Sequence, residues 1–177
     1  MEKTIDEPIQ LHIGGKEVKA GWKILNALPG EGVDFIGDVR DLSRFQDGSC
    51  RKVYASHVME HIGIKEFPAT LKEIHRILGE SGEFYFSVPD LEVLCRLFLR
   101  PELNSNQRFH VMTMMFGGQL DEYDFHHIGL SSEFMVEYFR AAGFSRVKSV
   151  KSFGLFNDGS EFKPYGVPIS LNLIAYK

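Results

Sequence analysis

The stretch LHIGGKEVKAGW, residues 11–22, decides the fold because it joins two apolar segments through a glycine turn. Residues 9–13 have the short apolar pattern of a β-strand, and residues 22–28 have the pattern of a second one. Parallel neighbouring strands need a crossover of about a dozen or more residues, which usually holds a helix. Only residues 16–21 follow the glycine pair. We therefore expect the first crossover helix to be missing or reduced to a turn.

The rest of the chain alternates apolar runs with helical patterns, which predicts an α/β fold with a mostly parallel sheet. In the segment 65–78, Phe67, Leu71 and Ile74 recur on one face of a helix. Glycine, serine and proline signals separate the elements, with a break predicted at Ser81-Gly82. The further predicted strands are 33–36, 52–56, 83–88, 147–153 and 169–176, and the further predicted helices are 91–98, capped by Asp90, and 132–142, between Ser131 and Gly143.

Composition and charge restrict the class of protein. The chain has 177 residues, of which 44% are hydrophobic and 25% charged, as expected for one globular domain over residues 1–177. Its net charge of −4 argues against general nucleic-acid binding. No apolar run approaches the length of a membrane span, and the acidic start lacks a signal peptide. Cys50 and Cys95 have no metal-binding or redox spacing. We therefore expect a cytoplasmic protein. The sequence is also compatible with a homo-oligomer.

An ordered set of motifs over nearly the whole chain resembles the class I S-adenosylmethionine-dependent methyltransferases. More narrowly, it is similar to small predicted methyltransferases whose first two strands lie close together. The resemblance implies a Rossmann-like sheet of seven strands with an antiparallel last strand, and S-adenosylmethionine as cofactor. The motifs are LHIGG with GW seven residues on, GVDFIGDVRDLSRF, VYASHVMEHI, EFPATLKEIHRILGESGEF, SVPDLEVL and HHIGLSSEFMVEYFRAAGF.

The resemblance also implies which residues bind the cofactor near the first two strands. The cofactor has no phosphate, so its loop needs close backbone approach more than an anion site, and glycine permits that approach. Gly14 and Gly15 match the opening of the family's glycine loop, whereas Lys16 stands where another glycine is frequent. Asn26 stands at the position where relatives have a carboxylate that binds the two ribose hydroxyls. Because an amide lacks the charge of a carboxylate, Asn26 predicts weaker binding.

Further cofactor contacts are expected after the third and fourth strands. Asp38 matches the acid that reads the adenine amino group in relatives, with the Val39 backbone amide beside it; a plain turn aspartate is the other interpretation. Ser56 and His57 stand at the carboxyl end of a parallel strand, where sites form. They are expected to border the methionine tail and the methyl group. His57 and His126 are the candidate general bases, needed only if the acceptor must lose a proton.

The histidines do not predict a metal site. HVMEH differs from HExxH, which places glutamate beside the first histidine, so Glu60 and His61 are expected to brace the following helix. His126 and His127 are neighbours that point apart on a helix or strand.

The segment 108–130 is expected to form a lid or substrate wall, because it combines adaptable methionines with a Gly117-Gly118 hinge. Its methionines also fit an ordinary core.

Two functions remain open from the sequence. The first is methyl transfer to a small or medium-sized acceptor, a small-molecule substrate that the sequence does not identify. The second is a non-catalytic relative that keeps the fold as a binding or assembly module, which Lys16, Asn26 and the short crossover favour. A third function, metal-dependent hydrolysis, is supported only by scattered histidines.

Overall fold

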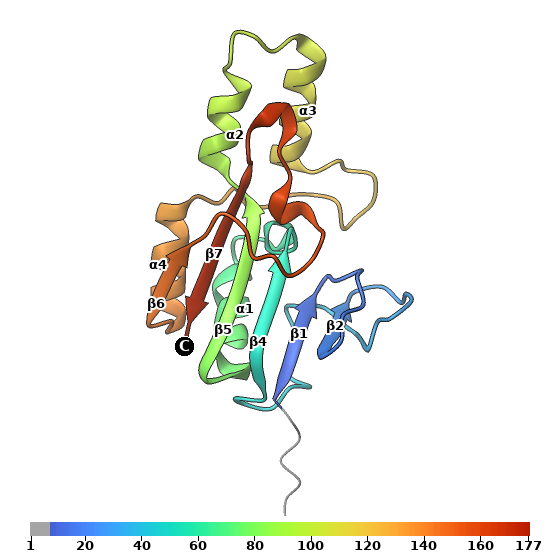
Figure 1. The fold of residues 1–177 in the computed structure, drawn as a ribbon, viewed down its shortest axis with the longest axis vertical. Coiled ribbons are helices and arrows are strands. Elements are labelled where there is room, and N and C mark those ends of the chain that lie inside the picture. The colour runs from blue at the N-terminus through green and yellow to red at the C-terminus, as the bar shows by residue number, and fades with distance from the viewer. Residues whose placement is uncertain (1–7) are drawn as a thin grey trace, which may run out of the picture.

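A computed structural model describes residues 8–177, so the first seven residues, which carry the acidic start, lie outside it. The described chain forms one seven-stranded sheet in the order β3-β2-β1-β4-β5-β7-β6 (Figure 1). The strands are β1 (Ile9–Ile13), β2 (Trp22–Asn26), β3 (Phe35–Ile36), β4 (Cys50–Ser56), β5 (Leu78–Pro89), β6 (Arg146–Ser149) and β7 (Ser170–Tyr176). β7 runs antiparallel to both β5 and β6, and the other pairs are parallel. The predicted α/β fold with an antiparallel last strand is confirmed.

The α-helices of the described chain all follow β4. They are α1 (Phe67–Ile77), α2 (Leu91–Phe98), α3 (Ser105–Phe116) and α4 (Ser132–Ala142). Asp90 caps α2, since its side chain accepts hydrogen bonds from the backbone N–H groups of Glu92 and Val93. α4 ends at Gly143, whose left-handed φ of 103° suits glycine. Both caps were predicted from the sequence.

The main core lies between one face of the sheet and helices α1 and α4. α1 buries Phe67, Leu71 and Ile74, the face that the sequence pattern predicts. From α4, the Phe139 ring packs edge-on against Phe84 and Phe86 of β5, with ring centroids 6.0 Å and 5.4 Å away. This core fixes the central strands whose carboxyl ends carry the site.

No helix joins β1 to β2, and the segment 150–167 covers the sheet face that such a helix would occupy. Phe156 packs on Trp22 and Tyr54 in a second aromatic cluster. Lys19 Nζ donates to the Leu155 carbonyl at 2.6 Å, and Glu17 accepts from the Asn157 backbone N–H at 3.0 Å. The missing first crossover helix is therefore confirmed, and a distant part of the chain replaces its packing.

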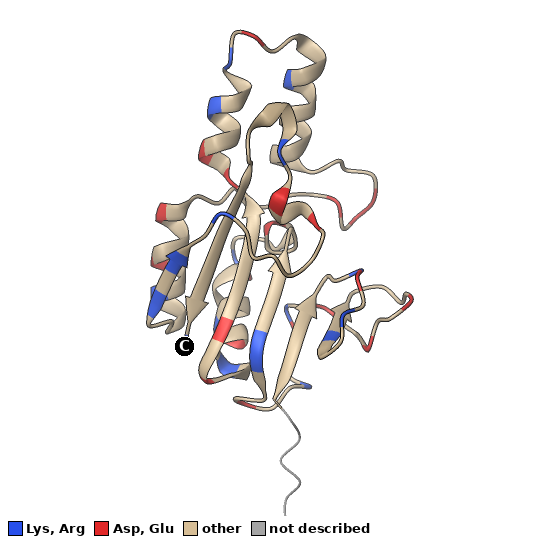
Figure 2. Ribbon diagram, in the orientation of Figure 1, with Lys and Arg blue, Asp and Glu red and all other residues tan. Residues whose placement is uncertain are grey.

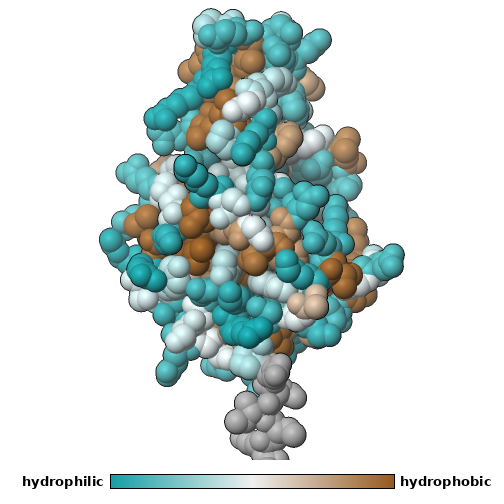
Figure 3. All heavy atoms as spheres, in the orientation of Figure 1, coloured by the Kyte–Doolittle hydropathy of each residue, from teal (hydrophilic) through white to brown (hydrophobic). Residues whose placement is uncertain are grey.

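Helices α2 and α3 form a hairpin beyond the carboxyl end of β5 (Figure 1). Leu94 and Leu97 pack on Val111 in a small cluster of their own. Apolar side chains such as Leu99 and Phe109 remain exposed on this hairpin, where brown patches appear at the top of Figure 3. Elsewhere, residues of both charge signs are interspersed along the described chain (Figure 2).

Two local predictions were wrong. Ser81-Gly82 does not separate α1 from the next strand, because β5 already starts at Leu78. α3 was not predicted as a helix, since it buries only Val111 and has little apolar periodicity. Its start is nevertheless marked in the sequence: Asn104 and Gln107 form a capping box. None of the helices in residues 8–177 is long and apolar enough to span a bilayer.

Candidate active site

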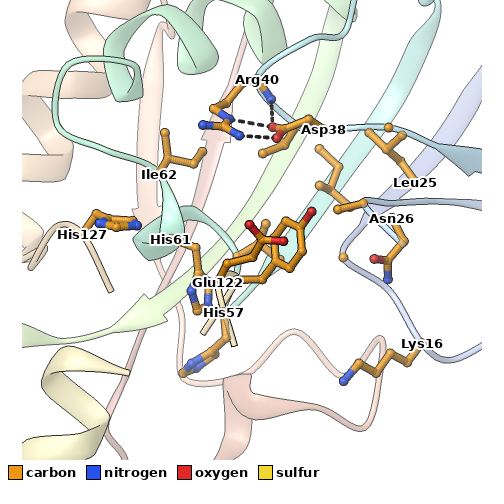
Figure 4. Close-up of a pocket in the computed structure, with 17 residues that line it drawn as sticks. Lys16, Leu25, Asn26, Asp38, Arg40, His57, His61, Ile62, Glu122 and His127 are labelled. Carbon is orange, nitrogen blue, oxygen red and sulfur yellow. Dashed lines mark hydrogen bonds and ion pairs between the residues drawn. The ribbon is translucent and has the colours of Figure 1, made fainter. Parts of the chain in front are cut away.

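A cleft of about 510 Å³ lies at the carboxyl ends of β1, β2, β3 and β4 (Figure 4). This is where open α/β sheets bind their ligands. Each of the four strands contributes the residues at or just after its end: Ile13 and Gly14, Leu25 to Ala27, Gly37 to Arg40, and His57 with Val58. The remaining lining comes from Lys16, His61, Ile62, Glu122, Tyr123 and His127. Its volume is in the range of small-molecule and cofactor sites.

The two glycines of the first loop have different surroundings. Gly14 lines the cleft, has a φ of 70° and donates its N–H to the Leu25 carbonyl at 2.8 Å. A Cβ there would lie 2.4 Å from Val58 Cγ2, so glycine is required. Gly15 is not among the residues that line the cleft. A Cβ on it would lie 2.6 Å from the ring of buried His12, so close packing explains this second glycine.

Asn26 holds the glycine loop against the end of β2. Its side-chain N–H group donates to the Gly15 carbonyl at 3.2 Å, and its Oδ1 accepts from the Leu28 backbone N–H at 3.3 Å. An aspartate could accept from Leu28 but could not donate to Gly15. The two hydrogen bonds therefore explain why an amide rather than a carboxylate occupies this position. Asn26 also lines the cleft, where the sequence predicts the ribose contact.

Asp38 lines the cleft but is also paired with Arg40 (Figure 4). Arg40 Nε donates to Oδ1 at 2.9 Å and its NH2 group to Oδ2 at 2.6 Å, while the Arg40 backbone N–H donates to Oδ1 at 2.8 Å. These Arg40 contacts lower the pKa of Asp38. The Val39 backbone N–H makes no hydrogen bond within the described chain and so remains a free donor beside the cleft.

His57 turns the chain out of β4 into the cleft. Its φ of 53° is a left-handed conformation rarely adopted by non-glycine residues. Its Nε2 lies 2.9 Å from Ser170 Oγ, and its Nδ1 lies 3.4 Å from a carboxylate oxygen of Glu60. Ser56 is outside the cleft lining, with its hydroxyl buried.

The second candidate base, His126, faces Glu60 rather than the cleft. The Glu60 carbonyl accepts from the His127 backbone N–H at 2.8 Å, which holds the segment after α3 against the end of β4. His126 Nε2 then lies 4.0 Å from Glu60 Oε1, and its ring meets the His61 ring edge-on. Burial lowers the pKa of His126. His127 instead lines the cleft, so the two neighbours do point apart.

Several cleft residues have no cofactor or catalytic role predicted from the sequence. Arg40 and Ile62 belong to recognised motifs but carry no pattern that assigns them to a site. Glu122 and Tyr123 come from the segment after α3 and line the cleft. Both lie within 108–130, for which a lid or substrate wall stays a prediction.

Comparisons with family models and with solved structures identify this fold. Residues 16–86 match a family model described as a methyltransferase domain. Between 96% and 98% of this chain superposes on the solved methyltransferases described below. The chain has the class I methyltransferase fold. The resemblance inferred from the sequence motifs is confirmed at the level of the fold.

Three solved methyltransferases of this fold show how far the likeness extends. One is a SAM-dependent methyltransferase from Archaeoglobus fulgidus, with 14% identity, 97% of this chain and 87% of that chain covered, and a TM-score of 0.57. A second, from Thermotoga maritima, has 18% identity, coverages of 98% and 84%, and a TM-score of 0.58.

The third is the Burkholderia thailandensis 1,6-didemethyltoxoflavin-N1-methyltransferase, solved with 1,6-didemethyltoxoflavin and S-adenosylhomocysteine. It has 16% identity, coverages of 96% and 70%, and a TM-score of 0.60. A search of curated proteins gives no significant sequence match. The superpositions establish the methyltransferase fold. Because the identities are this low, they do not identify the methyl acceptor.

Proposed function

We propose that the chain binds S-adenosylmethionine in the cleft and transfers its methyl group to a small or medium-sized acceptor. The observation that carries the proposal is the cleft itself, because four consecutive strand ends of a methyltransferase fold converge on it. The match to a methyltransferase-domain model covers three of these four strand ends completely. A neighbour of the same fold was solved with the demethylated cofactor.

The cleft residues supply suitable groups for each part of the cofactor. Asn26 would face the ribose hydroxyls through its amide, and Asp38 with the Val39 N–H would read the adenine edge. Asp38 Oδ1 already accepts two hydrogen bonds from Arg40 and Oδ2 accepts one, so the second lone pair of Oδ2 remains for the adenine amino group. Gly14 and His57 would border the methionine tail and the sulfonium.

The chemistry needs little from the protein beyond position. The sulfonium supplies the methyl group, which passes in line to an acceptor nucleophile while the sulfur keeps the electron pair of the broken bond. Holding the two reactants in this geometry lowers the barrier by several kcal/mol, on the order of 7 in well-oriented cases. Glu122 and Tyr123 would confine the acceptor as parts of the wall formed by 108–130. If the acceptor must lose a proton, His57 is better placed than His126, because only His57 lines the cleft.

A non-catalytic binding module is the second candidate, and two contacts favour it. Asn26 is already engaged with Gly15, and Asp38 with Arg40. Lys16 also lines the cleft (Figure 4), where its positive charge would repel the positively charged sulfonium. Such a module would keep the fold without turning over the cofactor.

The test uses a tryptophan that fills the cleft and a matched tryptophan beside it. Ala27 is exposed and lines the cleft, whereas Leu28 is 54% exposed and does not line it. Calorimetric titration with S-adenosylmethionine and S-adenosylhomocysteine should show one site in the wild type and in Leu28→Trp, and a loss of at least about tenfold in affinity in Ala27→Trp. Equal affinities in the two variants would place the ligand elsewhere. Binding without methyl transfer to any acceptor in a cell extract would favour the non-catalytic module.

A further inference from the structure

The carboxylate of Glu60 is buried among three histidines next to the cleft. Only 2% of its side chain is exposed. His57 Nδ1 lies 3.4 Å from Oε1, and His126 Nε2 lies 4.0 Å from the same oxygen. Glu60, His61 and His126 each offer a ligand atom, and the three atoms lie within 4.8 Å of one another. The cluster joins the turn after β4 to the segment that follows α3.

Neither Glu60 oxygen receives a hydrogen bond from the described part of the chain. A carboxylate removed from water without hydrogen bonds or a paired charge is strongly disfavoured. The neighbouring histidines approach it without hydrogen-bond geometry, so the folded chain leaves this buried group uncompensated by its own donors.

The outer hydrogen bonds of two histidines leave their inner ring nitrogens free. Ser170 has one hydroxyl hydrogen, which it donates to the Gly159 carbonyl at 2.8 Å, so at 2.9 Å it accepts from His57 Nε2–H. His57 Nδ1, on the other side of the ring, faces Glu60. His61 Nδ1 lies 3.1 Å from the Phe125 carbonyl, which can only accept, so its Nε2 carries the free lone pair. Ligand histidines in proteins commonly donate their other N–H to a carbonyl or a similar acceptor in this way.

We propose that Glu60, His61 and His126 bind a divalent transition-metal ion. One carboxylate and two imidazoles are a ligand set that suits zinc, iron or manganese better than magnesium or calcium. Tetrahedral ligands about 2.1 Å from zinc lie about 3.4 Å apart, so the three side chains need to close inward by about an ångström. Three protein ligands leave coordination positions open to water or another group. His57 lies within reach of the same carboxylate, and His57 and His61 both line the cleft, so an open position would border it.

This inference replaces the sequence-based expectation that the chain carries no metal site. The residues looked unsuitable in sequence because HVMEH differs from HExxH and because His126 and His127 are neighbours that point apart. The fold brings His61 to a segment 64 positions further along the chain, and no local pattern shows this. The proposal does not depend on methyl transfer, since its test measures metal binding alone.

The test is calorimetric titration of the full chain, first stripped with EDTA, with Zn²⁺ and with Mn²⁺. The wild type should bind one ion per chain. Glu60→Gln and His126→Ala should each weaken Zn²⁺ binding by about 100-fold or more, because they remove a direct ligand. The matched controls are Glu80→Gln and His110→Ala, both at exposed positions outside the cluster, and these should stay within about twofold of the wild type.

Absence of binding to the wild type, or equal affinity in the ligand and control variants, would overturn the proposal. If Glu60→Gln fails to fold by circular dichroism, His61→Ala replaces it, since His61 is less buried. The visible absorption of the Co²⁺-loaded wild type then gives a second readout. Its intensity should change in His61→Ala and remain in His110→Ala, and an unchanged spectrum in both would also refute the site.

Discussion

Replacing Asn26 with aspartate separates the structural role of this side chain from its role toward the cofactor. In the folded chain, the amide donates to the Gly15 carbonyl at 3.2 Å and accepts from the Leu28 N–H at 3.3 Å. Asn26→Asp keeps the second bond but sets a carboxylate oxygen against a carbonyl oxygen. Losing one hydrogen bond and leaving the carbonyl unsatisfied costs about 1–2 kcal/mol. For a chain of this size, the melting temperature should fall by roughly 2–8 °C.

The same substitution should strengthen the ribose contact if the cleft binds the cofactor. A charged acceptor gains on the order of 1 kcal/mol over a neutral one, which is several-fold in affinity, and the structural strain at Gly15 offsets part of that gain. Thermal unfolding and calorimetry with S-adenosylhomocysteine measure the two effects separately. Asn26→Ala is the control, because it removes the Gly15 bond without adding charge.

Asn26 has two separable roles, one toward Gly15 and one toward the ribose. If Asn26→Asp is as stable as the wild type, the bond to Gly15 does not hold the glycine loop. If Asn26→Asp is destabilised but binds the cofactor no more tightly than Asn26→Ala, the side chain does not contact the ribose.

Two further predictions concern His12 and Gly143. Burial lowers the pKa of His12 to about 4, below the unfolded value of 6.5, so its contribution to stability is complete above pH 6.5 and is lost as the pH falls toward 4. Urea unfolding should therefore show a loss of about 2 kcal/mol between pH 7 and pH 5 that is absent from His12→Phe; the same loss in both proteins would contradict this origin. Gly143→Ala should cost about 1–2 kcal/mol in the same assay, because φ is 103° and the new Cβ would lie 3.2 Å from the His75 ring, and an unchanged unfolding midpoint would contradict it.

Local signals in the sequence were enough to predict the seven strands of the described sheet and three of its four α-helices, although several predicted bounds differ from the observed ones. The strong apolar periodicity of α1 and the caps at Asp90 and Gly143 act within a few residues, so they can be recognised without knowing the fold. α3 was missed because a helix that buries only Val111 has little periodicity, although its capping signal was present.

Contacts between distant segments could not be predicted in this way. Phe156 lies more than a hundred residues from the β1–β2 crossover, and no local pattern shows that it covers the sheet there. The pairing of Glu60 with His126 likewise depends on the path of the chain after α3. For the cleft, by contrast, the sequence predicts that Gly14, Asn26 and His57 lie together, because parallel strands place their carboxyl ends at one edge of the sheet. All three residues line the cleft.

A crystal structure of the full chain with S-adenosylhomocysteine would show directly whether the cleft binds the cofactor. We expect density for the adenine beside Asp38 and the Val39 amide, for the ribose beside Asn26, and for the amino-acid tail near Gly14 and His57. Ligand bound outside this cleft, or an empty cleft in crystals grown with saturating ligand together with no heat on titration, would contradict it.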